Sequence, residues 1–383
     1  MRARRNVLVA LGSYDHRIHR GIARYAGRFN WHVNCDMCVS GILPRSWVGD
    51  GIITYLTNRA DLARFVSHAA VPVVDLTIIR HDIPLPRVVG DQEAIGRQAA
   101  EHFLERGFRH FVWCASNDLL LWEMRRRGFA QTLARHGLKT EAWIWKLRGP
   151  RHPDPWRTKQ QWLAEKLKAI PKPVAVFAFN DYEAANVLDG CTEANLSVPD
   201  DVAILGVDNN ELVCDCLHVP LSSVHHDLER LGYEGAALLH RLMLGQRAPT
   251  KPLLIPPRGV VVRRSTEVLA VNHEPCRRAL KFVQENTSPN IGVVDVSAAS
   301  GIPRRSLEHA FRKNLGRSIR EEIARARLAK VKSMLQQTDL SVADIAARAG
   351  FKTPQYLNLV FKKSTGMPPR KFRVARRVPV GPM

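Results

Sequence analysis

The sequence lacks a long apolar run. It has no stretch of about 18 consecutive apolar residues, and this predicts that the chain does not span a membrane. The basic residues at the start are followed only by the short run at positions 7–11, whereas a signal peptide needs a longer apolar core and a small-residue cleavage site. We therefore expect a cytoplasmic protein in which this run forms a buried first strand.

Cysteine is scarce and scattered, with seven residues in 383. Cys35 and Cys38 form a C-x-x-C, and Cys214 and Cys216 form a C-x-C, but neither pair is accompanied by a second pair with the spacing of a zinc site. The pattern predicts buried structural thiols in a reducing compartment and no metal centre.

The motifs of several common enzyme classes are also absent. The chain has no G-x-G-x-x-G, no G-x-x-x-x-G-K-[ST] and no G-x-S-x-G. The scattered cysteines do not provide the reactive thiol cluster that a DNA-repair methyl acceptor would need. We predict that the protein is not an enzyme and that it uses no cofactor.

Positive charge is abundant, and it is concentrated at one end of the chain. Residues 272–383 hold 22 Lys and Arg against 8 Asp and Glu, a net charge of +14, whereas the first 271 residues hold 35 against 28. A basic excess on one segment is typical of a domain that binds a polyanion such as DNA. A charge run by itself is more often a solvated face, so this interpretation depends on the motifs in the same segment.

Residues 341–363 predict two short helices joined by a tight turn. Val342, Ile345 and Ala349 recur at helical spacing, Gly350 follows, and a second helical pattern covers residues 353–363. Gly350 can adopt the positive φ that such a turn requires. Two helices joined in this way form either a helix-turn-helix, whose second helix enters the DNA major groove, or a purely structural helix pair.

A second copy of the pattern favours the helix-turn-helix. Residues 295–314 repeat it with Gly301 in the turn, and residues 318–336 between the copies predict one long amphipathic helix. Such a connector can hold two recognition helices about 34 Å apart, one turn of DNA. The side chains expected to contact DNA are Arg304, Arg305, Glu308, His309 and Arg312 on the first recognition helix, and Gln355, Asn358, Lys362 and Lys363 on the second.

These motifs resemble those of the AraC/XylS-type DNA-binding domain. The runs I-A-x-x-x-G-F, at Ile345–Phe351, and F-K-K-x-x-G-x-x-P-x-x-F-R, at Phe361–Arg373, match the C-terminal signature of that family. The resemblance covers roughly residues 274–377. It implies an all-α domain with two helix-turn-helix motifs.

The first 270 residues alternate short apolar runs with helical patterns. The predicted strands lie at 6–11, 51–56, 71–76, 109–114, 143–145, 174–179 and 202–208. Continuous apolar strands that alternate with helices are typical of parallel sheets covered on both faces, that is, doubly wound α/β units. The length of this region predicts two α/β lobes.

Ligands of open α/β sheets bind beyond the carboxyl ends of the strands. Polar residues at such ends, or opening the next helix, include Asp91, Asn180 and Asp208, and Arg125 lies in the helix after the strand at 109–114. Each Asp or Asn taken alone is more simply read as an ordinary helix cap.

The stretch from Phe179 to Asn209 resembles the periplasmic-binding-protein-like effector domain of LacI/GalR repressors. The resemblance implies that Asn180, Asp208 and Arg125 contact sugar hydroxyls, with Asp91 contributing from the first lobe. A sensor of this type followed by an AraC-type domain is similar to the XylR-type xylose operon regulators, whose N-terminal pattern is matched by Tyr14. Aromatic rings can also cover the apolar faces of a sugar, and Tyr14, Trp122 and Phe179 are available.

Together these patterns predict a sugar-responsive, sequence-specific transcription regulator that activates a pentose (xylose-like) catabolic operon. The expected domains are a sugar sensor over 1–268, a linker over 269–274 and an AraC-type DNA-binding domain over 275–378. The expected partners are double-stranded DNA, a monosaccharide with D-xylose favoured, a second copy in a homodimer, and RNA polymerase. The alternatives are a different sugar or non-sugar ligand, action as a repressor, and a sequence-indifferent architectural DNA binder.

Overall fold

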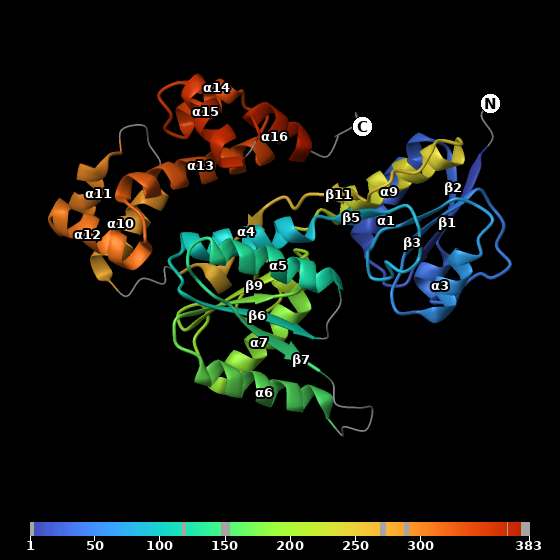
Figure 1. Ribbon diagram of the computed structural model, residues 1–383, viewed down its shortest axis with the longest axis horizontal. Coiled ribbons are helices and arrows are strands. Elements are labelled where there is room, and N and C mark those ends of the chain that lie inside the picture. The colour runs from blue at the N-terminus through green and yellow to red at the C-terminus, as the bar shows by residue number, and fades with distance from the viewer. Residues whose placement is uncertain are drawn as a thin grey trace. The chain divides into compact units, whose positions relative to one another are not determined.

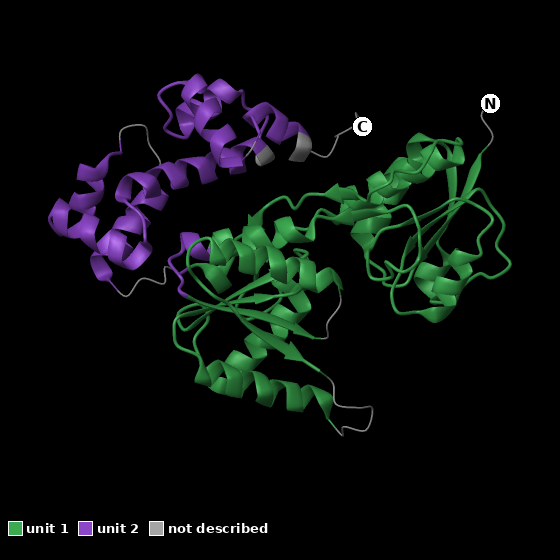
Figure 2. Cartoon of the chain, in the orientation of Figure 1, with its two compact units in different colours: residues 1–102, 110–267 green, residues 103–109, 268–383 purple. Residues whose placement is uncertain are grey.

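The computed structural model describes residues 4–116, 120–146, 154–268, 273–286, 291–365 and 367–376. The chain forms two compact units (Figure 2). Unit 1 comprises residues 1–102 and 110–267, and unit 2 comprises residues 103–109 and 268–383. Residues 269–272 of the predicted linker lie outside the described residues.

Unit 1 is built on two larger sheets and a two-stranded ribbon. The first sheet has the order β2-β1-β3-β4, and all its strands are parallel. Its strands are β1 (Arg5–Leu11), β2 (Trp31–Asn34), β3 (Gly51–Tyr55) and β4 (Val73–Asp75). Its helices are α1 (His16–Arg28), α2 (Asp36–Ser40), α3 (Ala60–Ser67) and α9 (Leu228–Met243), which returns to this sheet from late in the chain.

The second sheet has the order β12-β10-β9-β8-β6-β7, parallel except that β12 runs antiparallel to β10. Its strands are β6 (His110–Ser116), β7 (Glu141–Trp145), β8 (Val174–Ala178), β9 (Val202–Val207), β10 (Ser222–Val224) and β12 (Val260–Val261). Figure 1 shows α4 (Gln92–Glu105) and α5 (Leu120–Ala134) on one face of this sheet, and α6 (Pro155–Ala169) and α7 (Asp181–Ala194) on the other.

Short elements complete the unit. They are β5 (Val88–Gly90), β11 (Leu253–Ile255), α8 (Glu211–Cys214) and a 3-10 turn at Arg264–Thr266. Strands β5 and β11 pair in parallel between the segments that build the two larger sheets. Each sheet has its own apolar core, one around Val7, Ile22 and Leu239, and another around Val176, Leu163 and Ile204.

Unit 2 is helical. Its helices are α10 (Glu274–Glu285), α11 (Val293–Ser300), α12 (Arg304–Leu315), α13 (Ile319–Gln337), α14 (Val342–Arg348), α15 (Pro354–Thr365) and α16 (Pro369–Arg376). Within this unit, residues 103–109 are held by Arg317, which donates to the carbonyl oxygens of Leu104 at 3.2 Å and Glu105 at 3.0 Å. Arg317 also forms a buried ion pair with Glu322.

The long helix α13 connects two separate cores. Ile319 and Ile323 pack with α10, α11 and α12, whereas Val331 and Leu335 pack with α14, α15 and α16. Ser318 caps the helix by accepting a hydrogen bond from the amide of Glu321, whose carboxylate in turn accepts one from the Ser318 amide. One stiff helix therefore carries both helix-turn-helix motifs.

The predicted fold class is confirmed: parallel α/β sheets come first, and a helical domain follows. The helices and strands expected from the sequence all form, within a few residues of the expected bounds. Helices α2, α8, α10 and α16 and the short strands β2, β5, β10, β11 and β12 were not expected. These strands have only two to four residues each, too few for a periodic pattern to show.

The expectation for the cysteines holds only in part. All seven thiols are free, and Cys114, Cys191, Cys214 and Cys276 are buried, but Cys216 is exposed. Within the described residues, no helix is both long enough and apolar enough to cross a membrane.

Candidate functional site

The loop after β9 has a backbone conformation that residues other than glycine seldom adopt. The φ of Asp208 is 100° and that of Asn209 is 49°. The amide of Asn209 donates to Ser223 Oγ at 2.9 Å, and the amide of Asn210 donates to a carboxylate oxygen of Asp181 at 2.7 Å. These bonds hold the loop, and with it Asp208, at the carboxyl end of the sheet.

Arg17 fastens helix α1 to the same loop. Its guanidinium donates to the backbone carbonyl oxygens of Asp208 and Asn209, the latter at 3.1 Å, and pairs with Asp15 at 2.7 Å. The contact joins two segments that belong to different sheets of unit 1. Arg17 was not among the predicted ligand contacts, although it lies only three residues after Tyr14.

The Asp208 carboxylate is partly buried and paired with a histidine. Its Oδ1 lies 3.2 Å from His226 Nδ1, and 29% of its side chain is exposed. Burial alone would raise the pKa of Asp208, but the hydrogen bond with His226 and the positive charges of Arg125 and Arg17 outweigh that effect and hold this pKa below its ordinary value. At neutral pH the carboxylate is therefore ionised and can only accept hydrogen bonds, as a ligand hydroxyl requires.

Arg125 is positioned by the close approach of α4 and α5. A Cβ at Gly96 would lie 2.0 Å from the Arg125 carbonyl oxygen, and one at Gly128 would lie 2.2 Å from a carbonyl oxygen of α4, so both crossing points require glycine. Arg125 is 3% exposed. Its Nε donates to Gln92 Oε1 at 2.8 Å, and a terminal nitrogen donates to the Phe179 carbonyl oxygen.

Arg125, Asp208 and two aromatic rings come together at the ends of neighbouring strands. Burial lowers the pKa of Arg125, and the nearby charge of Asp208 acts in the opposite direction. The rings of Trp122 and Phe179 lie 4.3 Å apart between centroids, beside the Arg125 contact with Phe179. A donor, an acceptor and apolar rings form the chemistry that a polyhydroxylated ligand can use.

Asp91 and Asn180 both cap helices. The Asp91 carboxylate accepts a hydrogen bond from the amide of Ala94 at 2.9 Å, and Asn180 Oδ1 accepts one from the amide of Glu183 at 2.8 Å. Each cap engages one side-chain oxygen. The capping interpretation is therefore correct for both residues, and their contact with a ligand stays a prediction.

Tyr14 lies on the surface, where 51% of it is exposed. Its hydroxyl is 3.2 Å from His19 Nδ1 on helix α1. Contact between Tyr14 and a ligand also stays a prediction.

Tyr55 and Asp181 were not among the ligand contacts predicted from the sequence. Burial, and next the charge of Asp208, raise the pKa of Tyr55 to about 12. Burial and the charge of Asp208 raise the pKa of Asp181 to about 7. Asp181 also accepts a hydrogen bond from Ser223 Oγ at 2.6 Å. Both residues lie at strand ends that the sequence had already predicted, so the positional rule that pointed to Asn180 applies to them as well.

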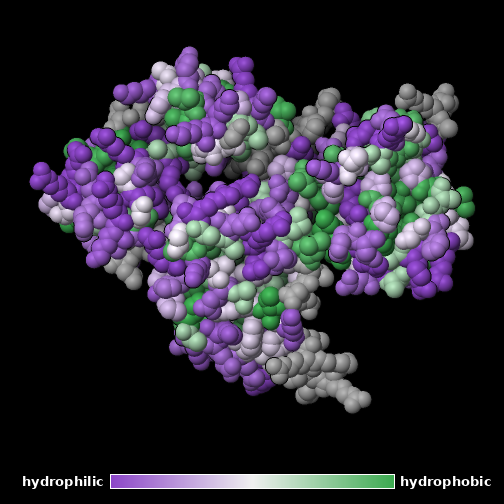
Figure 3. Space-filling view, viewed as in Figure 1, coloured by the Kyte–Doolittle hydropathy of each residue, from purple (hydrophilic) through white to green (hydrophobic). Residues whose placement is uncertain are grey.

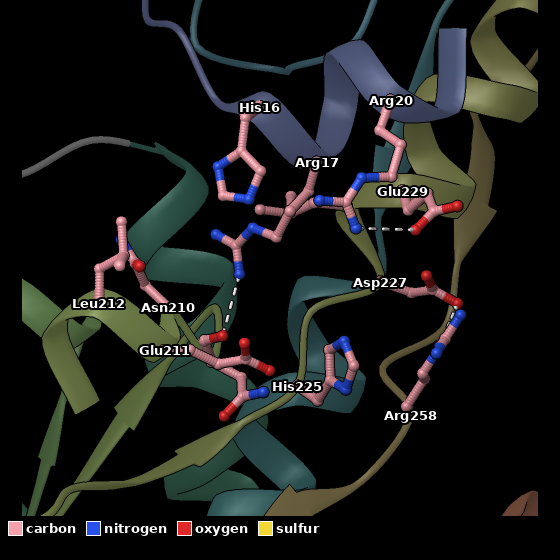
Figure 4. Close-up of a pocket in the computed structure, with 12 residues that line it drawn as sticks. His16, Arg17, Arg20, Asn210, Glu211, Leu212, His225, Asp227, Glu229 and Arg258 are labelled. Carbon is pink, nitrogen blue, oxygen red and sulfur yellow. Dashed lines mark hydrogen bonds and ion pairs between the residues drawn. The ribbon is translucent and has the colours of Figure 1, made fainter. Parts of the chain in front are cut away.

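A cavity of about 320 Å³ adjoins the Asp208 loop (Figure 4). Arg17, Arg20 and Asn209 line it, together with Asp227 and Arg258 from the segments around α9 and β12. It contains none of the five ligand-contacting side chains predicted from the sequence, but Arg17 and Asn209 link it to Asp208. Its arginines are balanced by carboxylates, as the 2.8 Å pair of Arg258 with Asp227 shows, so the cavity does not demand an anion.

In unit 2 both predicted turns have the expected geometry. Gly301 has a φ of 74° between α11 and α12, and Gly350 has a φ of 81° between α14 and α15. Leu307 and Phe311 anchor α12 in its core, and Leu357 and Phe361 anchor α15. The opposite faces of both helices are therefore left outside the core.

The side chains predicted to contact DNA lie on these outer faces. The exposed ones are Arg304, Arg305, His309, Arg312, Gln355, Asn358, Lys362 and Lys363. Glu308 is half-buried and accepts a hydrogen bond from Arg304 at 2.9 Å. The surface over α11 and α12 in Figure 3 is largely hydrophilic. On α15, Tyr356 and Leu359 are exposed by 57% and 69%, so the second helix presents apolar groups as well.

Comparisons with known proteins also separate a sensor-like region from a helix-turn-helix region. Residues 100–266 match the periplasmic binding protein-like domain, and residues 296–375 match a helix-turn-helix domain. The xylose operon regulatory protein of Escherichia coli is 26% identical over 94% of both chains. The protein of the same name from Haemophilus influenzae is 29% identical over 76% of this chain and 75% of its own. The solved structure of the xylose-binding transcription activator XylR covers 98% of this chain and 100% of its own, with a TM-score of 0.61 and 25% identity.

The chain is a DNA-binding transcription regulator that is similar to the xylose operon regulatory proteins. Its sensor-like sheets and its two helix-turn-helix motifs occur in the order that the sequence predicted. A LacI family regulator from Mycobacterium smegmatis shares the fold of the sensor region, with a TM-score of 0.55 at 21% identity over 68% of this chain.

Proposed function

We propose that this regulator senses a monosaccharide, with D-xylose favoured, through a site that contains Asp208 and Arg125. The observation that carries the proposal is the junction of an ionised acceptor, a buried guanidinium and the Trp122–Phe179 ring pair at the carboxyl ends of β8 and β9. Support for xylose comes from the names of the relatives, two of which are xylose operon regulatory proteins. Tyr14, Asp91 and Asn180 complete the proposed set of ligand contacts.

We propose further that the protein acts in the cytoplasm as a homodimer that activates transcription, with RNA polymerase as a partner. A solved structural relative is a transcription activator, which supports activation over repression. The two exposed recognition helices supply the surface for operator DNA. The protein has no enzymatic role in this proposal.

A thermal-shift screen of the full-length protein tests the effector. A ligand present at 100 times its dissociation constant stabilises a protein by about 2.7 kcal/mol. D-xylose is expected to raise the melting temperature, whereas L-xylose, its mirror image, provides a control with the same composition. A shift with another sugar and none with D-xylose would reassign the effector. No shift with any pentose or hexose would contradict the proposed sugar site.

A reporter assay separates activation from repression. With the operator upstream of a reporter gene, D-xylose is expected to raise expression only when the regulator is present. A fall in expression on deletion of the regulator gene supports activation, and a rise in the absence of sugar supports repression. A discrete footprint on the operator excludes an architectural DNA binder.

A further inference from the structure

His226 occupies the short segment between β10 and α9, next to the candidate effector site. It is 6% exposed, and its Nδ1 lies 3.2 Å from Asp208 Oδ1. Because an ionised carboxylate can only accept, the hydrogen of this bond belongs to His226 Nδ1. We infer that His226 is a positioning residue that orients the Asp208 carboxylate for the effector, an inference that rests on the proposed sugar site.

The other side of the imidazole ring is closed by backbone. A Cβ at Gly90 would lie 2.1 Å from His226 Nε2, so the ring packs directly against the Cα of a glycine. Nε2 is buried and has no hydrogen-bond partner among the described residues. The imidazole ring therefore makes one hydrogen bond, from Nδ1 to Asp208, and the contact with Gly90 sets its orientation.

Gly90, which the His226 ring contacts, lies directly before the helix that holds Arg125. It ends β5, and the next residues are Asp91, which caps α4, and Gln92, which holds Arg125. The imidazole of His226 thus lies between the backbone that starts α4 and the carboxylate that ends β9. One ring therefore fixes the Asp208 acceptor against the segment whose Gln92 holds the Arg125 donor.

The Asp208 side chain needs such support. Its backbone has a φ of 100° and is held by Arg17 and by a 3.0 Å bond from its own amide to the Val224 carbonyl oxygen. These contacts place the Cα but leave the carboxylate free to rotate about χ1 and χ2. Within the described residues, His226 is the side chain that donates to the Asp208 carboxylate. A carboxylate that is already oriented binds its ligand without the cost of being ordered.

The test uses a matched pair of amide substitutions in the full-length protein. His226→Asn places an N–H near the position of Nδ1, and His226→Gln places it near the position of Nε2. Calorimetric titration with D-xylose is expected to give a dissociation constant within about threefold of wild type for His226→Asn. His226→Gln and His226→Leu are expected to weaken binding by about tenfold or more, the effect of a lost hydrogen bond to a charged group.

A double-substitution cycle then shows whether His226 acts through Asp208. In an Asp208→Asn background, His226→Gln is expected to cause little further loss, because the oriented carboxylate is already gone. Equal binding by the Asn and Gln variants, or a full additional loss in the Asp208→Asn background, would overturn the inference while leaving the sugar site intact. If the wild-type protein does not bind D-xylose or any other sugar of the screen, the proposed function fails, and the role of His226 fails with it.

Discussion

Arg17 and Asp208 lie 191 positions apart in the sequence, yet the Arg17 guanidinium donates directly to the Asp208 backbone carbonyl. The bond ties helix α1, which packs on the first sheet, to the loop that ends β9 in the second. Two lobes that close on a ligand need contacts that form only in one arrangement. The Arg17 contact joins segments of the two sheets, and it lies beside the acceptor of the candidate site.

Arg17→Ala is therefore expected to weaken effector binding. It removes two hydrogen bonds from a charged donor to a loop with positive φ, and each such bond is worth about 1.5–3 kcal/mol at most. A loss of roughly tenfold in sugar affinity, measured by calorimetry, is the expected outcome. Arg20→Ala is the matched control, since Arg20 is on the same helix, is 59% exposed and pairs with Glu229 only at 4.0 Å. Equal losses for both variants would argue against the contact as the cause.

Arg125→Ala and Asp208→Ala are each expected to abolish the sugar-induced thermal shift while the protein stays folded. Each removes a charge-assisted hydrogen bond from a largely buried site, at a cost of roughly 1.5–3 kcal/mol, about 10- to 150-fold in affinity. Arg126→Ala serves as the control, because Arg126 lies on the same helix in an exposed pair with Glu123. Wild-type binding by both site variants would show that the pocket has been assigned to the wrong residues.

Asp181 is expected to make stability depend on pH. Burial, and then the charge of Asp208, raise its pKa to about 7 from an ordinary 3.8. Folding therefore favours the protonated form, so this contribution is fully present below about pH 4 and is lost as the pH rises through 7. The melting temperature of the wild type should fall between pH 5 and pH 8, and that of Asp181→Asn should fall less. Asp75, whose pKa burial also raises to about 7, remains in both proteins and accounts for the residual slope.

The first recognition helix is expected to read bases. Arg305 and His309 are both exposed and one helical turn apart on α12, so both can reach base edges in the major groove. Arg305→Ala and His309→Ala should change base preference at particular operator positions, by roughly 1–3 kcal/mol for a lost bidentate arginine contact. Leu359 cannot donate a hydrogen bond, so α15 should read more through shape or thymine methyl groups. Selection from a randomised operator library gives the measurement.

Lys363 is expected to behave differently from Arg305. As a phosphate contact, its removal in Lys363→Ala should weaken binding about equally on all sequences and lower the salt slope by about one. Binding to the same library at two salt concentrations distinguishes the two effects. The assignment is wrong if Lys363→Ala alters base preference while Arg305→Ala only weakens binding uniformly.

Much of the fold could be predicted because it is local. The apolar runs that became β1, β8 and β9 are continuous, and the turns at Gly301 and Gly350 follow helices with a clear 3.6-residue period. These features arise from the geometry of the backbone over about ten residues, and a sequence shows them directly. The basic charge of residues 272–383 likewise needs no structure to be seen.

The arrangement of the site was decided by tertiary structure. The sequence pointed to Asp208 and Arg125, but it could not show that His226 and Arg17 hold Asp208. These contacts join residues from different strands and helices, and they depend on how the sheets pack. A periodic pattern along the chain does not show which distant side chains contact one another. Those contacts depend on how the sheets and helices pack and on which partners are available to buried polar groups.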